Sequence, residues 1–152
     1  MPTTISITDL PTLAGVDLGY SDWLEVGQDR IDLFAHATGD DQWIHLDAER
    51  ARTGPFGTTI AHGFLSLALI APLWEQVLTV TGSSMSVNYG IDRLRFISPV
   101  PAGSAVRLHS TVESVTEIAG GWQLTVEQLL GVQDATRPAV AATCLFRFYP
   151  AA

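Results

Sequence analysis

The chain has 152 residues, of which 47% are hydrophobic and 16% charged, so it is long and apolar enough to bury a core as one domain over 1–152, and general disorder is excluded. Its formal net charge is −8, and every basic residue is an arginine. An acidic chain without a basic run excludes a broad nucleic-acid surface, although a few arginines can still hold the phosphates of a small ligand.

No segment predicts export or membrane insertion. Residues 1–15 contain neither a basic region nor a long apolar run, so we expect no signal peptide. The most apolar stretch, 63–78, is interrupted by Pro72 and Glu75 and is too short to cross a bilayer. The single cysteine, Cys144, lies in a period-2 apolar segment and is expected in the core rather than as a nucleophile. These features favour a soluble, cytoplasmic protein without a membrane partner.

The first predicted elements are two short helices. Residues 29–37 place Ile31 and Phe34 near one face of an amphipathic helix. Gly39 follows it and can adopt the left-handed conformation that ends a helix. Asp47 can cap the start of the next helix.

The longest predicted helix covers residues 62–79. From Phe64 to Trp74 its side chains are apolar on every face, which is typical of a helix buried inside a structure. Pro72 is expected to bend or divide this helix.

After Gly82 the hydrophobic pattern changes to period 2, which predicts strands. They are expected over 92–100, 105–115, 122–130 and 139–149, with a tight hairpin at Gly120-Gly121. A sheet with one apolar face needs cover, and an all-apolar helix needs wrapping. The simplest architecture is an α+β hotdog fold, in which an antiparallel sheet wraps around a central buried helix. Its outer sheet edge is open to a second copy, so we expect a homodimer.

The segment 38–47, TGDDQWIHLD, concentrates acid and imidazole groups. Asp40 and His45 lie in a loop between two predicted helices, where both side chains can face one point. Next to Trp43 and Ile44, such a pair could hold one water molecule between a base and an acid. Spacing alone equally allows Asp40 to close a turn and His45 to be a hydrogen-bonded, half-buried histidine.

A metal site is the other alternative for this region. His36, His45 and His62 could supply ligands together with the aspartates. However, the chain has no HxH, HExxH or cysteine pair, so no metal is predicted.

The second candidate segment is GPFGTTIAHGF, residues 54–64, which leads into the long helix. The first N–H groups of a helix have no partner within it, and Gly63 has no side chain to block a ligand. The N–H of Gly63 could therefore polarise a carbonyl oxygen, as an oxyanion hole does. The alternative is that Gly63 only permits close packing.

Together these segments resemble the MaoC-like dehydratase family, in particular its single-hotdog branch of nodulation protein N-like sequences and (R)-specific enoyl-CoA hydratases. The family pattern is [ST]-G-D-x-x-x-x-H-x-D followed by H-G-[FM]. Here it is matched by Thr38–Asp40, His45, Asp47 and His62–Phe64. The flanking segments SDWLEVGQDRIDLFA and VNYGIDRLRFISPVPAG also resemble this branch, so the resemblance covers nearly the whole chain.

The resemblance implies a homodimeric enzyme that adds water to a trans-2-enoyl-CoA and forms a (3R)-3-hydroxyacyl-CoA. Asp40 and His45 would hold the water: one takes its proton as oxygen attacks C3, and the other delivers a proton to C2. We favour Asp40 as the base. The N–H of Gly63 would stabilise the enolate-like thioester oxygen. Neither a metal nor a redox cofactor is implied.

Two positions depart from this pattern. Asp41 stands where many members of the branch carry histidine, which puts the pH dependence of activity in doubt. Ala71 stands where some hydratases have a serine, so no serine is expected in the site.

Five further residues are candidate substrate contacts. Asn88 and Tyr89 could line an acyl tunnel or the dimer seam, or serve strand packing. Arg93 and Arg95 share one strand face and could bind coenzyme A phosphates, or be ordinary solvated arginines. His62 is expected to fix the loop by hydrogen bonding rather than to transfer protons.

Two other functions compete with hydration. The first is a hotdog acyl-CoA thioesterase, which usually needs a carboxylate at the start of the central helix or within it. Residues 63–73 contain none. The second is a non-catalytic acyl-thioester binding protein, which would be expected to lose Asp40 or His45.

Overall fold

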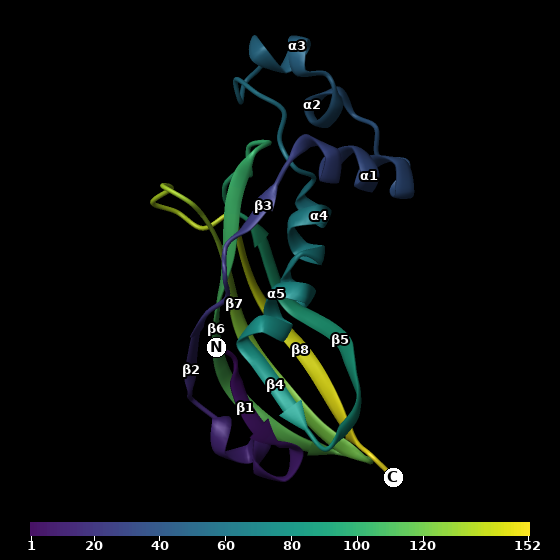
Figure 1. The fold of residues 1–152 in the computed structure, drawn as a ribbon, viewed down its shortest axis with the longest axis vertical. Coiled ribbons are helices and arrows are strands. Elements are labelled where there is room, and N and C mark those ends of the chain that lie inside the picture. Colours follow the sequence, from purple (N-terminus) through teal and green to yellow (C-terminus); the bar gives the residue numbers. More distant parts are fainter.

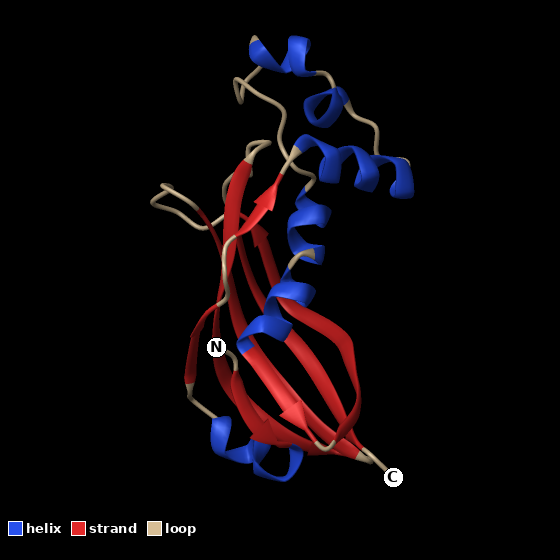
Figure 2. Cartoon of the chain, viewed as in Figure 1, coloured by secondary structure: helices blue, strands red, loops and turns tan.

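The computed structural model describes residues 1–152 and shows a long, bent antiparallel sheet curled around a pair of short helices (Figure 1; Figure 2). The sheet strands are β2 (Asp17–Tyr20), β3 (Leu24–Val26), β5 (Ser83–Phe96), β6 (Ser104–Ile118), β7 (Gly121–Val132) and β8 (Val140–Pro150). They lie in the order β2-β6-β7-β8-β5, with β3 also paired to β6. The α+β hotdog fold predicted from the sequence is confirmed.

Six helices accompany the sheet. They are a 3-10 helix (Ile7–Leu13), α1 (Gln28–Thr38), α2 (Trp43–Leu46), α3 (Ala48–Arg52), α4 (Gly63–Ala68) and α5 (Ile70–Val77). The predicted termination of the first helix is confirmed: Gly39 follows α1 in the left-handed conformation, with a φ of 79°. Asp47 caps α3, since its carboxylate accepts a hydrogen bond from the Arg50 N–H at 3.0 Å. No helix is both long and apolar enough to span a membrane.

The predicted central helix is divided at Leu69 into α4 and α5. Pro72 explains the division, because it has no N–H to donate to the carbonyl of Ala68, four residues earlier. The two halves still run end to end inside the curve of the sheet (Figure 2).

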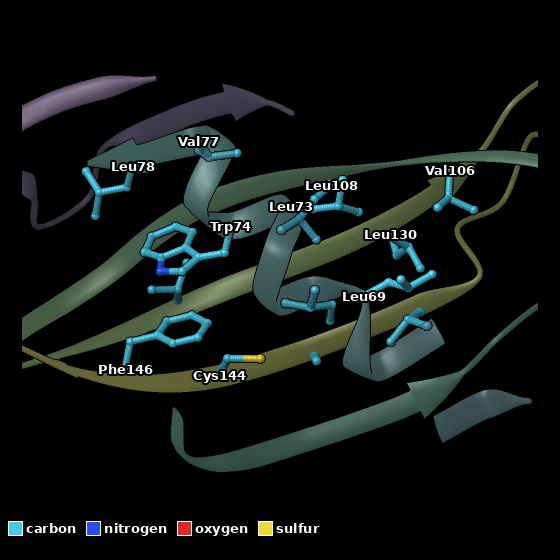
Figure 3. Close-up of a cluster of buried hydrophobic side chains, with 14 of the residues drawn as sticks. Leu69, Leu73, Trp74, Val77, Leu78, Val106, Leu108, Leu130, Cys144 and Phe146 are labelled. Atoms are coloured by element: carbon cyan, nitrogen blue, oxygen red, sulfur yellow. The ribbon is translucent and has the colours of Figure 1, made fainter. Parts of the chain in front are cut away.

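The core lies between this helix pair and the inner face of the sheet (Figure 3). Leu73 is fully buried, and Trp74 stacks on Phe146 with ring centroids 4.8 Å apart and planes 8° apart. Alternate residues of the strands, such as Val106 and Leu108, face them with no exposed surface. Truncating a buried leucine of this kind to alanine costs about 2–5 kcal/mol, so this core fixes the position of α4.

The N-terminal strands were not predicted. β1 (Thr3–Ser6) pairs in parallel with β4 (Leu78–Thr81), while β2 and β3 pair with β6. Each has only three or four residues, which is too short for a period-2 pattern to be recognised. Their partners lie far along the chain, so only the folded structure reveals them.

Candidate active site

The segment between α1 and α3 brings Asp40 and His45 close to His62, the residue before α4. Gly39 turns the chain away from α1 in the left-handed conformation, so Asp40 leaves the helix at once. His45 lies in α2, a single short turn. Asp40, His45 and His62 each offer one donor or acceptor atom, and these atoms lie within 4.8 Å of one another.

His45 is oriented by the backbone. Its side chain is 5% exposed, and Nδ1 lies 2.7 Å from the carbonyl oxygen of Ile60. A carbonyl only accepts hydrogen bonds, so Nδ1 carries the proton in this contact. Nε2 is left as the nitrogen that can accept a proton when the ring is neutral or donate one when it is charged.

Asp40 is exposed, so its carboxylate is in contact with water although Trp43 and Ile44 lie nearby in the sequence. The guanidinium of Arg50 lies 4.2 Å from the centre of the Trp43 ring. A Cβ added at Gly54 would lie 3.1 Å from the same ring, so the indole packs against α3 and the turn after it. Asp41 is exposed as well.

His62, the residue before α4, contacts both Asp40 and His45. It is 1% exposed, and its Nε2 donates a hydrogen bond to the backbone carbonyl of Asp40 at 2.9 Å. Its ring stacks on that of His45, with centroids 3.8 Å and planes 25° apart. His62 thus holds the Asp40 loop and supports the imidazole of His45.

The same stacking argues against a shared metal ion. An imidazole binds a metal through a lone pair that lies in the plane of its ring. The rings of His45 and His62 lie one above the other, so their lone pairs do not meet at one point. The remaining nitrogen of His62, Nδ1, is buried without a hydrogen-bond partner.

Gly63 is the first residue of α4 and borders a cavity of about 310 Å³. As the first helical residue, its N–H has no acceptor within the helix. A Cβ at this position would lie 3.1 Å from the ring of Phe96, which lines the same cavity. Ile60, whose carbonyl orients His45, lines it too, so the imidazole of His45 lies next to this cavity wall.

Comparison with known proteins identifies the family. A family model described as MaoC like domain matches residues 10–132. The chain belongs to the MaoC-like family. The resemblance inferred from the two motifs is thereby confirmed.

Its relatives extend over nearly the whole chain. The 3-hydroxyacyl-thioester dehydratase Z of Mycobacterium tuberculosis (strain ATCC 25618 / H37Rv) is 46% identical over 149 residues, covering 97% of this chain and 99% of that protein. Nodulation protein N of Rhizobium leguminosarum bv. viciae is 43% identical over 142 residues, covering 91% of this chain and 88% of that protein. The unliganded R-hydratase PhaJ1 of Pseudomonas aeruginosa has a similar structure, with a TM-score of 0.73 and 26% identity over 91% of this chain and 83% of that one.

Gln28 is a positioning residue of this MaoC-like site that the sequence analysis missed. Its Nε2 donates to the carbonyl of His45 at 2.7 Å, and its Oε1 accepts from the hydroxyl of Thr59 at 2.6 Å. One side chain therefore ties the end of α2 to the segment that precedes α4. A glutamine at the start of a helix gives no local signal, because its partners are 17 and 31 residues away.

Asn88 and Tyr89, proposed as substrate contacts, lie in different surroundings. Asn88 lines a second, largely apolar cavity of about 270 Å³ between β5 and the helix pair, where Ala71 also lies. Tyr89 is 54% exposed, and the Arg147 guanidinium packs on its ring.

Arg93 and Arg95 do share one face, as predicted, but they line a cavity with Glu113 and Glu127 rather than with Asp40 or His45. The structure therefore does not bring either arginine to the MaoC-like site.

Proposed function

We propose that this protein is an (R)-specific enoyl-CoA hydratase, which adds water to a trans-2-enoyl-CoA to give a (3R)-3-hydroxyacyl-CoA. At the coarser level it is a hydro-lyase, the class of the M. tuberculosis 3-hydroxyacyl-thioester dehydratase that is 46% identical to it. The observation that carries the proposal is the convergence of Asp40 with an oriented, buried His45 behind a cavity bordered by Gly63.

In this mechanism one water molecule lies between the Asp40 carboxylate and Nε2 of His45. Asp40 accepts a proton from the water as its oxygen attacks C3 of the enoyl group. His45 delivers a proton to C2 from Nε2, the nitrogen that the Ile60 carbonyl leaves available. Both groups contact the same water molecule, so the two additions take place on the same face of the double bond.

The thioester oxygen gains negative charge as the water adds. The N–H of Gly63 stabilises this oxygen, because it is not used within α4 and glycine has no side chain of its own to block the approach. Removing one donor of this kind typically slows turnover by about 10²–10³. No step requires a metal or a redox cofactor.

We further propose that a second copy of the chain completes the enzyme as a homodimer. β5 is an edge strand of the main sheet: it pairs with β8 on one side, and no strand of this chain pairs with its other side. Large apolar side chains are exposed on it and on the adjoining helix: Phe64 is 65% exposed, Ile91 42% and Phe96 46%. An edge of this kind is normally covered, and pairing with the same edge of another copy would cover it.

The first test mixes purified protein with crotonyl-CoA and follows the absorbance of the enoyl thioester, with a thiol reagent in a parallel sample. Loss of enoyl absorbance without release of thiol, and a product of (3R) configuration on chiral analysis, is the expected result. Release of free thiol would identify a thioesterase instead. No change with short, medium or long enoyl-CoAs would overturn the hydratase in favour of an acyl-thioester binding role.

A further inference from the structure

The outer face of the sheet carries a row of stacked polar and aromatic side chains where β2 and β3 meet β6. Nε2 of His109 lies 2.9 Å from a carboxylate oxygen of Asp17, and the His109 ring lies 4.5 Å from that of Tyr20. The guanidinium of Arg107 lies 4.1 Å from the centre of the Tyr20 ring and 4.5 Å from that of Trp23. The buried neighbours of Arg107 in β6 face the core, so this row lies on the side of the sheet opposite to α4 and α5.

Both aromatic rings lie close to the Arg107 guanidinium. A guanidinium packed against the face of a ring keeps its in-plane N–H groups available as donors. The Arg107 side chain makes no hydrogen bond and no ion pair within 4.0 Å, so these donors have no protein acceptor. The planar fork of a guanidinium with free donors suits two oxygens of one carboxylate or phosphate group.

A second arginine lines the same hollow. The loop that joins β7 to β8 projects from the end of the sheet near β3 (Figure 1). Together with the row it encloses a cavity of about 330 Å³, to which it contributes Arg137. Arg137 also has no ion pair, and Asp134 is the one acidic residue in the lining. Two of the eight arginines of an acidic chain thus face one cavity.

We propose that this outer cavity binds a phosphate-bearing ligand, whose phosphate oxygens accept hydrogen bonds from the Arg107 edge and from Arg137. Two arginines fit a group with two negative charges better than a single carboxylate. Trp23 is 44% exposed and Tyr20 59% exposed, so an aromatic surface remains beside the arginines for a planar group of the ligand.

The phosphate could belong to a free nucleotide or to the carrier of an acyl substrate. The cavity is on the opposite face of the sheet from His45, but the two sites meet at one loop. Pro138 lines the outer cavity, and the next residue, Ala139, lines the cavity beside Gly63. A carrier could therefore cross this loop with its phosphates on the outer side. The binding claim itself does not depend on the proposed hydratase.

The test titrates inorganic pyrophosphate into the full-length protein at constant ionic strength, by calorimetry and by thermal melting. We expect saturable binding and a raised melting temperature in the wild type. Arg107→Gln and Arg137→Gln should each weaken binding at least tenfold, while the matched control Arg93→Gln, on another part of the outer face, should not. Absence of binding, or equal binding by all four proteins, would overturn the proposal.

Arg107→Lys distinguishes loss of ligand contacts from loss of stability, because it keeps the positive charge but lacks the planar guanidinium with its paired N–H donors. Its melting temperature without ligand should match that of the wild type, while its pyrophosphate affinity falls. Unchanged affinity in this variant would contradict the role assigned to the guanidinium edge.

Two further measurements separate the sources of the phosphate once binding is established. If ADP binds more tightly than pyrophosphate and the variants keep the wild-type KM for crotonyl-CoA, the ligand is a free nucleotide. If the variants raise the KM for crotonyl-CoA but not for crotonyl-pantetheine, the phosphates belong to the carrier. Either result supports the site.

Discussion

One nitrogen of His45 is committed to the Ile60 carbonyl, and the ring itself is stacked on His62. Its orientation is therefore set by contacts that do not involve substrate. Asp40, by contrast, is exposed, and what holds it near His45 is the hydrogen bond from His62 to its backbone carbonyl. The carboxylate of Asp40 is thus positioned through its main chain, and the imidazole of His45 through its ring.

We expect Asp40→Asn and His45→Ala each to lower kcat for crotonyl-CoA hydration by about 10²–10⁴, the usual contribution of a positioned acid or base. Asn keeps the size of the side chain but cannot take a proton. The measurement is the initial rate of enoyl absorbance loss, with circular dichroism to check folding. His36→Ala, an exposed histidine on α1, is the control and should keep wild-type turnover. Unchanged turnover in both dyad variants would remove Asp40 and His45 from the mechanism.

Cys144 gives a prediction that depends on pH. Burial raises the pKa of its thiol from 9.0 to about 11. The folded state favours the protonated thiol, so its contribution to stability is complete below pH 9 and is lost as pH rises through 11. In the native protein at pH 8 we expect no reaction with a thiol-specific reagent over hours, and stoichiometric labelling in denaturant. Rapid labelling of the native protein would show that the thiol is accessible.

At the scale of residues, the sequence indicated the proposed reacting groups but not the residues that support them. Asp40, His45 and Gly63 lie in local motifs, and the structure brings them to one place. Gln28 contacts His45 and Thr59 across the fold, so no motif contains it. The contact of Trp43 with Arg50, on the next helix, was likewise not indicated by the motif.

At the scale of elements, the groove between α5 and the strands β5 and β8 decides what fits beside the central helix. Its cavity of about 270 Å³ is lined by the small residues Ala71 and Gly90 and by Phe146. The cavity beside Gly63 borders α4 and the same two strands. An acyl chain bound at Gly63 could extend into this groove.

Ala71→Leu tests this extension, because its larger side chain would fill the groove. We expect kcat/KM for dodecenoyl-CoA to fall about tenfold or more, while the value for crotonyl-CoA changes less than twofold. Ala48→Leu, on an exposed position of α3, is the matched control and should change neither value. An unchanged ratio between the two substrates in Ala71→Leu would mean that the chain takes another path.

Elements with a strong repeating pattern were the predictable ones. The long strands and the all-apolar helix follow from period and composition, and Pro72 indicated a division that the structure shows at Leu69. The hairpin was predicted at Gly120-Gly121, and the two-residue connection is Ala119-Gly120, with φ of 81° at Gly120. The short strands β1 to β3 escaped prediction because their stability comes from distant partners rather than from their own residues.

At the scale of the whole molecule, the open sheet edge at β5 predicts that the protein forms a homodimer. We expect sedimentation to give twice the monomer mass, and Ile91→Lys to shift the protein toward monomer, because a lysine on an edge strand opposes pairing. Val16→Lys introduces the same charge at an apolar position that is 36% exposed elsewhere, and should leave the mass unchanged. A wild-type protein that sediments as a monomer at micromolar concentration would contradict the proposed dimer.

The pairing of β2 and β3 with β6 also affects how the chain is made. Asp17 pairs with Thr111 and Leu24 with Val106, so these strands leave the ribosome long before their partner exists. At about 5–20 residues per second, β2 and β3 wait roughly 5–20 s before β6 has been synthesised. During that interval the apolar residues Ile7, Leu10 and Leu13, which the finished protein buries, have no core to enter. The N-terminal segment is therefore where we expect chaperones to bind the nascent chain first.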